Sequence, residues 1–230
     1  MDKNKKLQEF WNQVFLMDEN TKKEIKENIK EDDYIHLVPS EKLLNAVKAL
    51  SKSKNVLDYG CGNGWASIIL AKNGCSQVTS VDTSINSIDS LKFYASIFNT
   101  KNINAFSIDF NWLSKEDESK YDGLICSNVL DVVDEDTSNM IIKELNRVLK
   151  KHSKAIIGLN YYLTSEKIKE KNLKLENGKE LYIDGVLRLL NKSDEEWQEE
   201  LKKYFKIIKL EYFAWPNESK ETRRLFYLEK

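Results

Sequence analysis

The chain has 230 residues, of which 41% are hydrophobic, and its 36 lysines and arginines nearly balance its 37 aspartates and glutamates. This length can bury one sizeable core, so we expect a single domain over residues 1–230. The near-neutral charge argues against a polyanion as the main partner, so neither nucleic acid nor a membrane surface is expected.

The three cysteines are odd in number and form no C-x-x-C pair, which indicates free thiols in a reducing compartment. The start of the chain is charged and polar, and no later window approaches the roughly 20 apolar residues that a membrane span needs. We therefore expect a cytoplasmic protein.

The first part of the chain has the pattern of amphipathic helices. Apolar residues recur at helical spacing within residues 5–29, which predicts one or two helices there. Pro39 ends this stretch, and Ser40 is a suitable N-cap for a further helix. Residues 1–50 are therefore expected to form an N-terminal helical cap.

Short apolar runs then alternate with helical stretches, as in βαβ units whose parallel strands are buried on both faces. The expected strands cover residues 55–59, 77–81, 103–108, 123–127 and 155–159. The expected helices cover residues 65–73, 85–98 and 135–149. These elements predict an α/β fold with its core over residues 51–160.

The regular alternation of strands and helices is interrupted in the last third of the chain. Residues 173–184 have the pattern of a hairpin around Asn177-Gly178, a pair that suits a type I′ turn. We expect residues 161–192 to form an inserted segment on the substrate side. The expected C-terminal elements, within residues 193–230, are a helix over 193–205 and a pair of strands over 207–214 and 224–228.

The most informative stretch is the sequence D-Y-G-C-G-N-G over residues 58–64, between an apolar strand and a helix. Glycines let the backbone turn tightly and approach a ligand, and N–H groups at a helix start favour polar ligand atoms. The alternative is a tight turn without a ligand. A dinucleotide fingerprint would need its third glycine at Trp65, and no Lys-Ser/Thr pair follows for a nucleoside triphosphate.

The pattern D-x-G-x-G-x-G resembles the first motif of the class I S-adenosylmethionine-dependent methyltransferases, and the resemblance continues over residues 55–160. It implies a Rossmann-like fold with a mostly parallel seven-stranded sheet, an antiparallel terminal strand and helices on both faces. It also implies S-adenosylmethionine as the cofactor and methyl transfer as the reaction.

The resemblance further implies which residues hold the cofactor. Asp82, at the end of the second strand, would take the two ribose hydroxyls, although an acid there is also an ordinary N-cap. Asp109 would accept from the adenine amine and Phe110 would pack on the ring, the alternative being a strand end and a core residue. The implied cofactor-binding residues are Asp58, Gly60, Cys61, Gly62, Asp82, Thr83, Asp109, Phe110, Asn128 and Val129.

No catalytic triad is visible, and methyl transfer needs none, because a positioned acceptor can attack an activated methyl group directly. A general base is required only where the acceptor must first lose a proton. The candidate bases are His36 and either Tyr161 or Tyr162. Asp131 stands where many small-molecule methyltransferases carry His, so it either orients a substrate or is a solvated loop acid. No cluster of ligating side chains indicates a metal.

Acceptor recognition is expected outside the shared core, because loops at the carboxyl ends of the strands set the substrate in such folds. The N-terminal helices and residues 163–192 are the candidate segments. Phe10, Trp11 and Tyr34 would form an aromatic lid, or they simply pack onto the domain.

The sequence favours a methyltransferase that acts on a small molecule, because its lysines are interleaved with acids and form no concentrated basic face. Methylation of RNA or protein is the alternative among enzymes. A protein that binds S-adenosylmethionine or its demethylated product without catalysis is the alternative from another class, since residues 128–133 show no clear acceptor-activating side chain.

Overall fold

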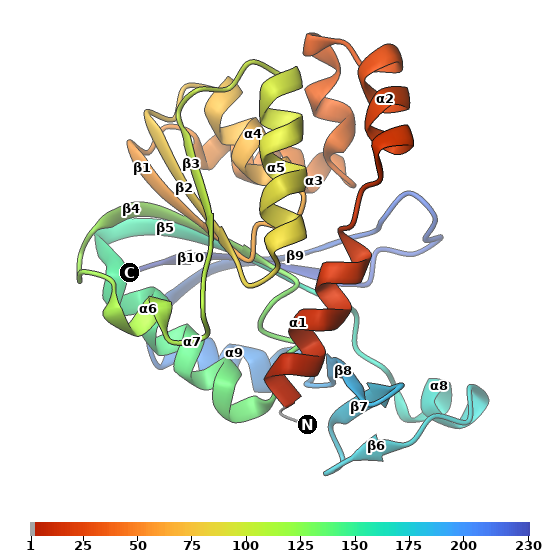
Figure 1. Ribbon diagram of the computed structural model, residues 1–230. Helices are drawn as coiled ribbons and strands as arrows, with labels where there is room; N and C mark the ends of the chain where they lie inside the picture. The colour runs from red at the N-terminus through yellow and green to blue at the C-terminus, as the bar shows by residue number, and fades with distance from the viewer. Residues whose placement is uncertain (1–2) are drawn as a thin grey trace.

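The computed structural model describes residues 3–230 (Figure 1). Its main sheet contains β1 (Asn55–Tyr59), β2 (Gln77–Asp82), β3 (Ile103–Ser107), β4 (Tyr121–Ser127), β5 (Leu149–Leu159), β9 (Lys206–Phe213) and β10 (Arg223–Glu229). The strand order is β3-β2-β1-β4-β5-β10-β9. From β3 to β5 the neighbours pair in parallel, whereas β10 pairs antiparallel with β5 and β9. The expected mostly parallel seven-stranded sheet with an antiparallel terminal strand is confirmed.

Helices cover both faces of this sheet (Figure 1). One face carries α3 (Glu41–Leu50), α4 (Trp65–Lys72) and α5 (Ile85–Ile97), and the other carries α6 (Trp112–Lys115), α7 (Glu135–Val148) and α9 (Asp194–Lys202). Val56 and Leu57 are neighbours in β1, and both are fully buried, in different hydrophobic clusters. The continuous apolar runs of the sequence therefore reflect strands buried on two sides.

Helix α7 illustrates how apolar residues at helical spacing fix a helix against the sheet. Ile141, Leu145 and Val148 are buried against the sheet at a spacing of three or four residues. Asp134 caps the helix, because its carboxylate accepts the Thr137 N–H at 3.0 Å. The carboxyl end of β4 and the loop before α7 are held in place by this packing.

The boundary between α7 and β5 differs from expectation. β5 begins at Leu149, which pairs with Tyr121, and not at Ala155. The register shifts between Tyr121 and Gly123, and His152 has a positive φ of 62° in the irregular stretch. Such a bulge leaves extra polar residues in one strand, and these obscure the strand pattern in the sequence.

The segment after β5 forms α8 (Ser165–Glu170) and a second sheet of β6 (Leu175–Glu176), β7 (Glu180–Ile183) and β8 (Val186–Leu190). The turn predicted at Asn177-Gly178 is confirmed, with φ values of 51° and 75°. The hairpin predicted over residues 173–184 is confirmed as β6 and β7, whereas β8 was not predicted. Asp184-Gly185 makes a second turn, with φ values of 54° and 73°, that returns the chain as β8. Asp-Gly is itself a type I′ signal.

The N-terminal segment contains α1 (Lys3–Val14), α2 (Glu19–Asn28) and the 3₁₀ helix η1 (Glu31–Leu37). One or two helices were expected here, and the structure has two, whereas η1 was not predicted. α1 lies between α5 and the second sheet (Figure 1). It is held by hydrogen bonds from Gln8 Nε2 to Thr83 O at 2.7 Å and from Asn86 Nδ2 to Asn12 O at 2.9 Å.

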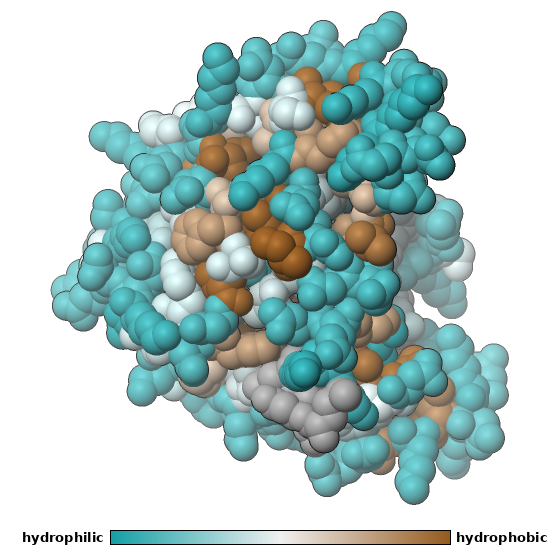
Figure 2. All heavy atoms as spheres, viewed as in Figure 1, coloured by the Kyte–Doolittle hydropathy of each residue, from teal (hydrophilic) through white to brown (hydrophobic). Residues whose placement is uncertain are grey.

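The face that carries α1 is mostly hydrophilic, with hydrophobic residues gathered near its middle (Figure 2). The exposed large hydrophobic residues at the end of α1 and the start of α5 are Val14, Leu16 and Ile85. None of the helices in the described part of the chain is long and apolar enough to cross a membrane.

Candidate functional site

The loop between β1 and α4 uses backbone conformations that favour glycine. Gly60, Gly62 and Gly64 have φ values of 74°, 52° and 82°. A Cβ on Gly60 would lie 2.2 Å from Val129 Cγ2, and a Cβ on Gly64 would lie 2.3 Å from Leu91 Cγ. The loop therefore needs glycine both for its turns and for close contact with its neighbours.

A cavity of about 530 Å³ opens beside this loop, at the carboxyl ends of β1, β2 and β4. Ligand sites commonly have volumes of about 300–1,000 Å³, and this edge of an open α/β sheet is where ligands bind. The wall is formed by Leu7, Trp11, Phe15, Leu37, Pro39, Tyr59, Gly60, Cys61, Gly62, Asn63, Trp65, Asp82, Thr83, Ile108, Phe110, Ser127, Asn128, Val129, Val132, Val133, Ile141, Trp215, Pro216, Asn217 and Glu218.

Most of the predicted cofactor residues meet at this wall. Those that line it are Gly60, Cys61, Gly62, Asp82, Thr83, Phe110, Asn128 and Val129. Asp58 and Asp109 do not contribute to the wall. Motifs that are separated along the chain therefore form one continuous surface in the structure.

Asp82 lies at the wall and also shapes the glycine loop. Its Oδ2 accepts the Gly62 N–H at 3.0 Å, and its Oδ1 accepts the Ser84 N–H at 2.8 Å. Burial raises the pKa of this carboxyl, while the hydrogen bonds from Ser84 and Gly62 oppose the shift. A carboxylate has about four lone-pair sites, so Asp82 retains acceptor capacity toward the cavity.

Asp58 is buried within the fold and supports the loop rather than facing the cavity. The Ser67 hydroxyl donates to Asp58 Oδ2 at 2.5 Å and lies 2.7 Å from the Ser80 hydroxyl. Burial raises the pKa of Asp58 to about 7, against the effect of the Ser67 hydrogen bond. The first acid of the motif therefore connects β1, α4 and β2 to one another.

Asp109 lies between two wall residues, Ile108 and Phe110, but its own side chain is exposed. Its Oδ1 accepts the Asn111 N–H at 2.8 Å, and its Oδ2 lies 3.3 Å from Lys115 Nζ. Successive side chains of an extended segment point in opposite directions, which places this carboxylate outside the wall. The structure gives Asp109 a local capping contact at the start of α6.

The candidate bases His36, Tyr161 and Tyr162 lie away from the cavity wall that the described residues form. His36 is exposed, although Leu37 and Pro39 beside it line the cavity. Tyr161 packs instead against the small hydrophobic cluster of the second sheet, which includes Leu163.

Asp131 is fully buried and also lies outside the wall, so neither of its two expected roles is correct. Its Oδ2 accepts the Asn160 N–H at 2.6 Å. Burial raises the pKa of Asp131, while the Asn160 hydrogen bond and the nearby Arg224 guanidinium oppose the shift. Chain direction after β4 turns this residue inward, where it contacts the fold rather than a substrate or solvent.

The helix α1 covers the glycine loop with aromatic side chains. Trp11, which was expected in an aromatic lid, lines the cavity and stacks on Phe15 with ring centroids 6.0 Å apart. A Cβ on Gly62 would lie 3.0 Å from Phe15 Cζ. Phe10 contacts the Arg188 guanidinium and Tyr34 packs on Phe98, so these two residues belong to the surrounding packing.

The loop between β9 and β10, residues 214–222, also borders the cavity, although no motif in the sequence predicts this role. The residues of this β9–β10 loop that line the cavity are Trp215, Pro216, Asn217 and Glu218. The Arg223 guanidinium lies 3.7 Å from the centre of the Trp215 ring and pairs with Glu218 at 2.7 Å. A Trp-Pro pair in a short polar connection between strands was the only available signal.

The sequence profile of a family described as a methyltransferase domain matches residues 50–209. The chain belongs to this family. The identification as a class I S-adenosylmethionine-dependent methyltransferase domain is confirmed, and S-adenosylmethionine is the cofactor of the domain. The matched residues include the glycine loop and every strand end that borders the cofactor side of the cavity.

Two solved structures illustrate the shared fold. A SAM-dependent methyltransferase from Methanosarcina mazei is 19% identical, with a TM-score of 0.60 over 76% of this chain and 92% of that chain. The 1,6-didemethyltoxoflavin-N1-methyltransferase of Burkholderia thailandensis is 14% identical, with a TM-score of 0.62 over 83% of this chain and 79% of that chain. At these identities the likeness establishes the fold.

A curated relative is the ribosomal protein L11 methyltransferase of Lactobacillus gasseri, which is 30% identical over 128 residues. The match covers 56% of this chain and 38% of that protein. The chain thus spans about two fifths of the length of the curated relatives that it matches, at 38% and 40%.

Proposed function

We propose that this chain transfers a methyl group from S-adenosylmethionine to a small molecule. The observation that carries the proposal is the roof of the cavity, which we define as residues 3–15, that is α1 and the residue after it, together with residues 215–218. Trp11, Phe15 and Trp215 are its aromatic wall residues. Such a roof suits an enclosed small acceptor, whereas a folded protein or an RNA would have to pass it to reach the methyl group.

The groups at the glycine loop fit the cofactor. Asp82 offers carboxylate oxygens that suit a pair of ribose hydroxyls, and Phe110 offers an apolar face for a base. Gly60 and Gly62 leave the backbone open to close approach. S-adenosylmethionine supplies an activated methyl group when it is bound there.

The other contributions of the chain are orientation of the acceptor and exclusion of water. Positioning of two reactants can contribute roughly 7–11 kcal/mol to a barrier. Among the described residues, the wall contains no lysine, arginine or histidine, so an anionic acceptor would be desolvated there without a cationic partner. Leu37, Val133 and Trp215 favour a neutral acceptor with an apolar body.

Titration followed by labelling tests this proposal. Calorimetry should show binding of S-adenosylhomocysteine and no binding of NAD, and Gly60→Val should lose that binding because its side chain would meet Val129. A cell extract, incubated with the protein and methyl-labelled S-adenosylmethionine, should then show label in its small-molecule fraction. Label confined to macromolecules would overturn the proposal.

Methylation of a ribosomal protein is the second candidate, because the curated relatives at 30% and 31% identity carry that activity in their names. It predicts label in the ribosomal protein fraction instead. The double variant Trp11→Ala, Phe15→Ala separates the two candidates. Opening the roof should weaken methylation of an enclosed small acceptor and leave methylation of a protein side chain unchanged or faster.

A further inference from the structure

Four polar side chains, two of them in the wall of the cavity and two behind it, are linked by hydrogen bonds, and we call this set the relay. Glu218 accepts from Arg223 at 2.7 to 3.0 Å through both carboxylate oxygens. Arg223 Nη1 donates to Asn160 Oδ1. Asn160 Oδ1 also accepts from Asn128 Nδ2 at 2.9 Å. The relay therefore runs from the β9–β10 loop to the end of β4, where Asn128 lines the cavity.

The chemistry of Arg223 determines which amide atoms of Asn160 and Asn128 face each other. A guanidinium has only donors, so the atom of Asn160 that faces it must be the amide oxygen. Asn128 must then turn its NH₂ group toward that same oxygen, which leaves its Oδ1 on the other side. The Ser127 hydroxyl donates to Asn128 Oδ1 at 3.1 Å, and a carbonyl oxygen can accept a second hydrogen bond.

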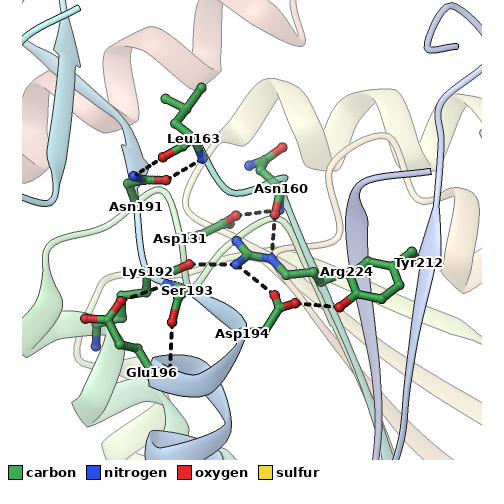
Figure 3. A network of polar contacts seen from close by, with 10 residues as sticks. All are labelled: Asp131, Asn160, Leu163, Asn191, Lys192, Ser193, Asp194, Glu196, Tyr212 and Arg224. Atoms are coloured by element: carbon green, nitrogen blue, oxygen red, sulfur yellow. Dashed lines mark hydrogen bonds and ion pairs between the residues drawn. The ribbon is translucent and has the colours of Figure 1, made fainter. Parts of the chain in front are cut away.

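The backbone of Asn160 is clamped on both sides (Figure 3). Its N–H donates to Asp131 Oδ2 at 2.6 Å, and its C=O accepts from Arg224 Nε at 2.8 Å. Arg224 Nη1 in turn donates to Lys192 O at 2.7 Å. Asp131 and Arg224 are both buried, so Asn160 sits on a rigid support that joins β5, β10 and the inserted segment.

The conformation of Asn128 is also unusual. It has a positive φ of 57°, in the left-handed region that asparagine tolerates better than most residues. Its N–H donates to Gly158 O at 2.8 Å, which ties its backbone to β5. A left-handed residue at a cavity wall, held through both its backbone and its side chain, indicates a geometry that the site requires.

We propose that Arg223 and Asn160 are positioning residues that keep Asn128 Oδ1 turned toward the cavity, where it accepts an N–H of the methyl acceptor. The inference rests on the proposed function and names its substrate class: a neutral amine that carries at least one N–H. The nitrogen lone pair forms the new N–C bond as the C–S bond breaks and its electron pair stays on sulfur. The N–H proton then leaves to water.

The other polar groups of the wall favour nitrogen over oxygen as the acceptor atom. A hydroxyl would have to lose its proton to a base before or during attack. Asp82 accepts two backbone N–H groups and is assigned to the ribose hydroxyls, and Glu218 is paired with Arg223, so neither carboxylate serves as the base for that proton. Burial also raises the pKa of the Cys61 thiol and of the Tyr59 hydroxyl, which keeps both protonated. A neutral amine needs no base.

Binding of two probes tests the substrate class without turnover. Aniline carries an N–H and N,N-dimethylaniline does not, and both are titrated into protein saturated with S-adenosylhomocysteine. In Arg223→Met the ratio of the aniline to the N,N-dimethylaniline dissociation constant should rise about five- to tenfold, as expected for loss of one hydrogen bond. Arg147→Met, which removes an ion-paired arginine of α7 outside the cavity, should leave the ratio unchanged.

Two substitutions at Asn160 test whether its side chain positions Asn128 or only supports the fold. Asn160→Asp keeps an oxygen for Arg223 and for Asn128, so it should retain the wild-type ratio. Asn160→Leu keeps the backbone clamp and loses that oxygen, so it should behave as Arg223→Met does. Equal ratios in the wild type, Asn160→Leu and Arg223→Met would overturn the inference, even if small molecules are methylated.

Side-chain hydrogen exchange provides a readout that needs no acceptor. Bonded to Asn160, the Asn128 NH₂ protons should exchange slowly in the wild type and in Asn160→Asp, and faster in Asn160→Leu. Fast exchange in the wild type would show the NH₂ group facing the cavity and would overturn the relay. Slow exchange together with label confined to macromolecules would instead reject the proposed function and leave the relay intact.

Discussion

The two ends of the cavity are built in opposite ways. The cofactor end is a backbone turn with neighbouring strand ends, all within residues 58–130. The acceptor end combines α1 with residues 215–218, from opposite ends of the chain. The first depends on the absence of side chains at Gly60 and Gly64, and the second depends on side chains held by distant partners. Under the proposed function, local sequence specifies cofactor binding, whereas tertiary packing specifies acceptor selection.

Four aspartates near the ends of strands show the same contrast between local sequence and tertiary packing. Asp82 is the last residue of β2 and Asp109 follows β3, yet of the two only Asp82 lines the cavity. Asp58 and Asp131 are both buried, one within the glycine loop support and one beside Asn160. Residue type at a strand end does not decide the role of a carboxylate, because the direction of the side chain does.

The largest effect should come from the turn that the cofactor end requires. Gly64→Ala should lower the free energy of unfolding by about 3–5 kcal/mol, because its Cβ would overlap Leu91 in a left-handed conformation. Gly74→Ala is the matched control: its φ is 100°, and no atom lies within 4 Å of the added Cβ. It should lose about 1–2 kcal/mol. Equal losses in urea unfolding would refute the role of the contact.

The support beneath that turn should respond to pH. The pKa of Asp58 is raised from 3.8 to about 7, so its buried neutral form costs no stability at pH 4, and stability falls as the pH rises toward 7. Asn does not ionise. The stability of Asp58→Asn relative to wild type should therefore increase by about 3–4 kcal/mol between pH 4 and pH 8. Thermal unfolding across this range measures it, and a constant difference would contradict the assignment.

The comparison of Asp82 with Asp109 can be sharpened by paired substitutions. Asp82→Asn should raise the dissociation constant for S-adenosylhomocysteine about ten- to a hundredfold, because a charge-assisted pair of hydrogen bonds is lost. Asp109→Asn should have little effect, since that side chain lies outside the wall. Calorimetry on both variants decides the point. A comparable loss in Asp109→Asn would mean that this acid turns inward when the cofactor binds.

The smallest effect is expected at the acceptor end. Trp215→Leu should raise the acceptor KM about fivefold, for loss of one aromatic contact of about 1 kcal/mol, and leave S-adenosylhomocysteine binding unchanged. Trp112→Leu, which alters an aromatic residue of α6 outside the cavity wall, is the matched control. An equal change in cofactor affinity would show that the two ends of the cavity are not separable.

Much of the cofactor side could be predicted because its signals are local. The apolar runs reveal strands buried on both faces, and Gly60, Gly62 and Gly64 mark a turn that few other residues can adopt. The turn at Asn177-Gly178 was found for the same reason. His36 and Tyr161 were poor candidates, because a residue type near a motif carries no information about the direction of its side chain.

By itself the sequence determined the fold class, the glycine turn and the cofactor, since each depends on conformational preferences and hydrophobic spacing within short segments. Only the tertiary structure decided which acids face the cavity, that Asp131 is buried beside Asn160, and that Trp215 completes the roof. Those outcomes depend on contacts between residues far apart in the chain, and such contacts leave no periodic pattern in the sequence.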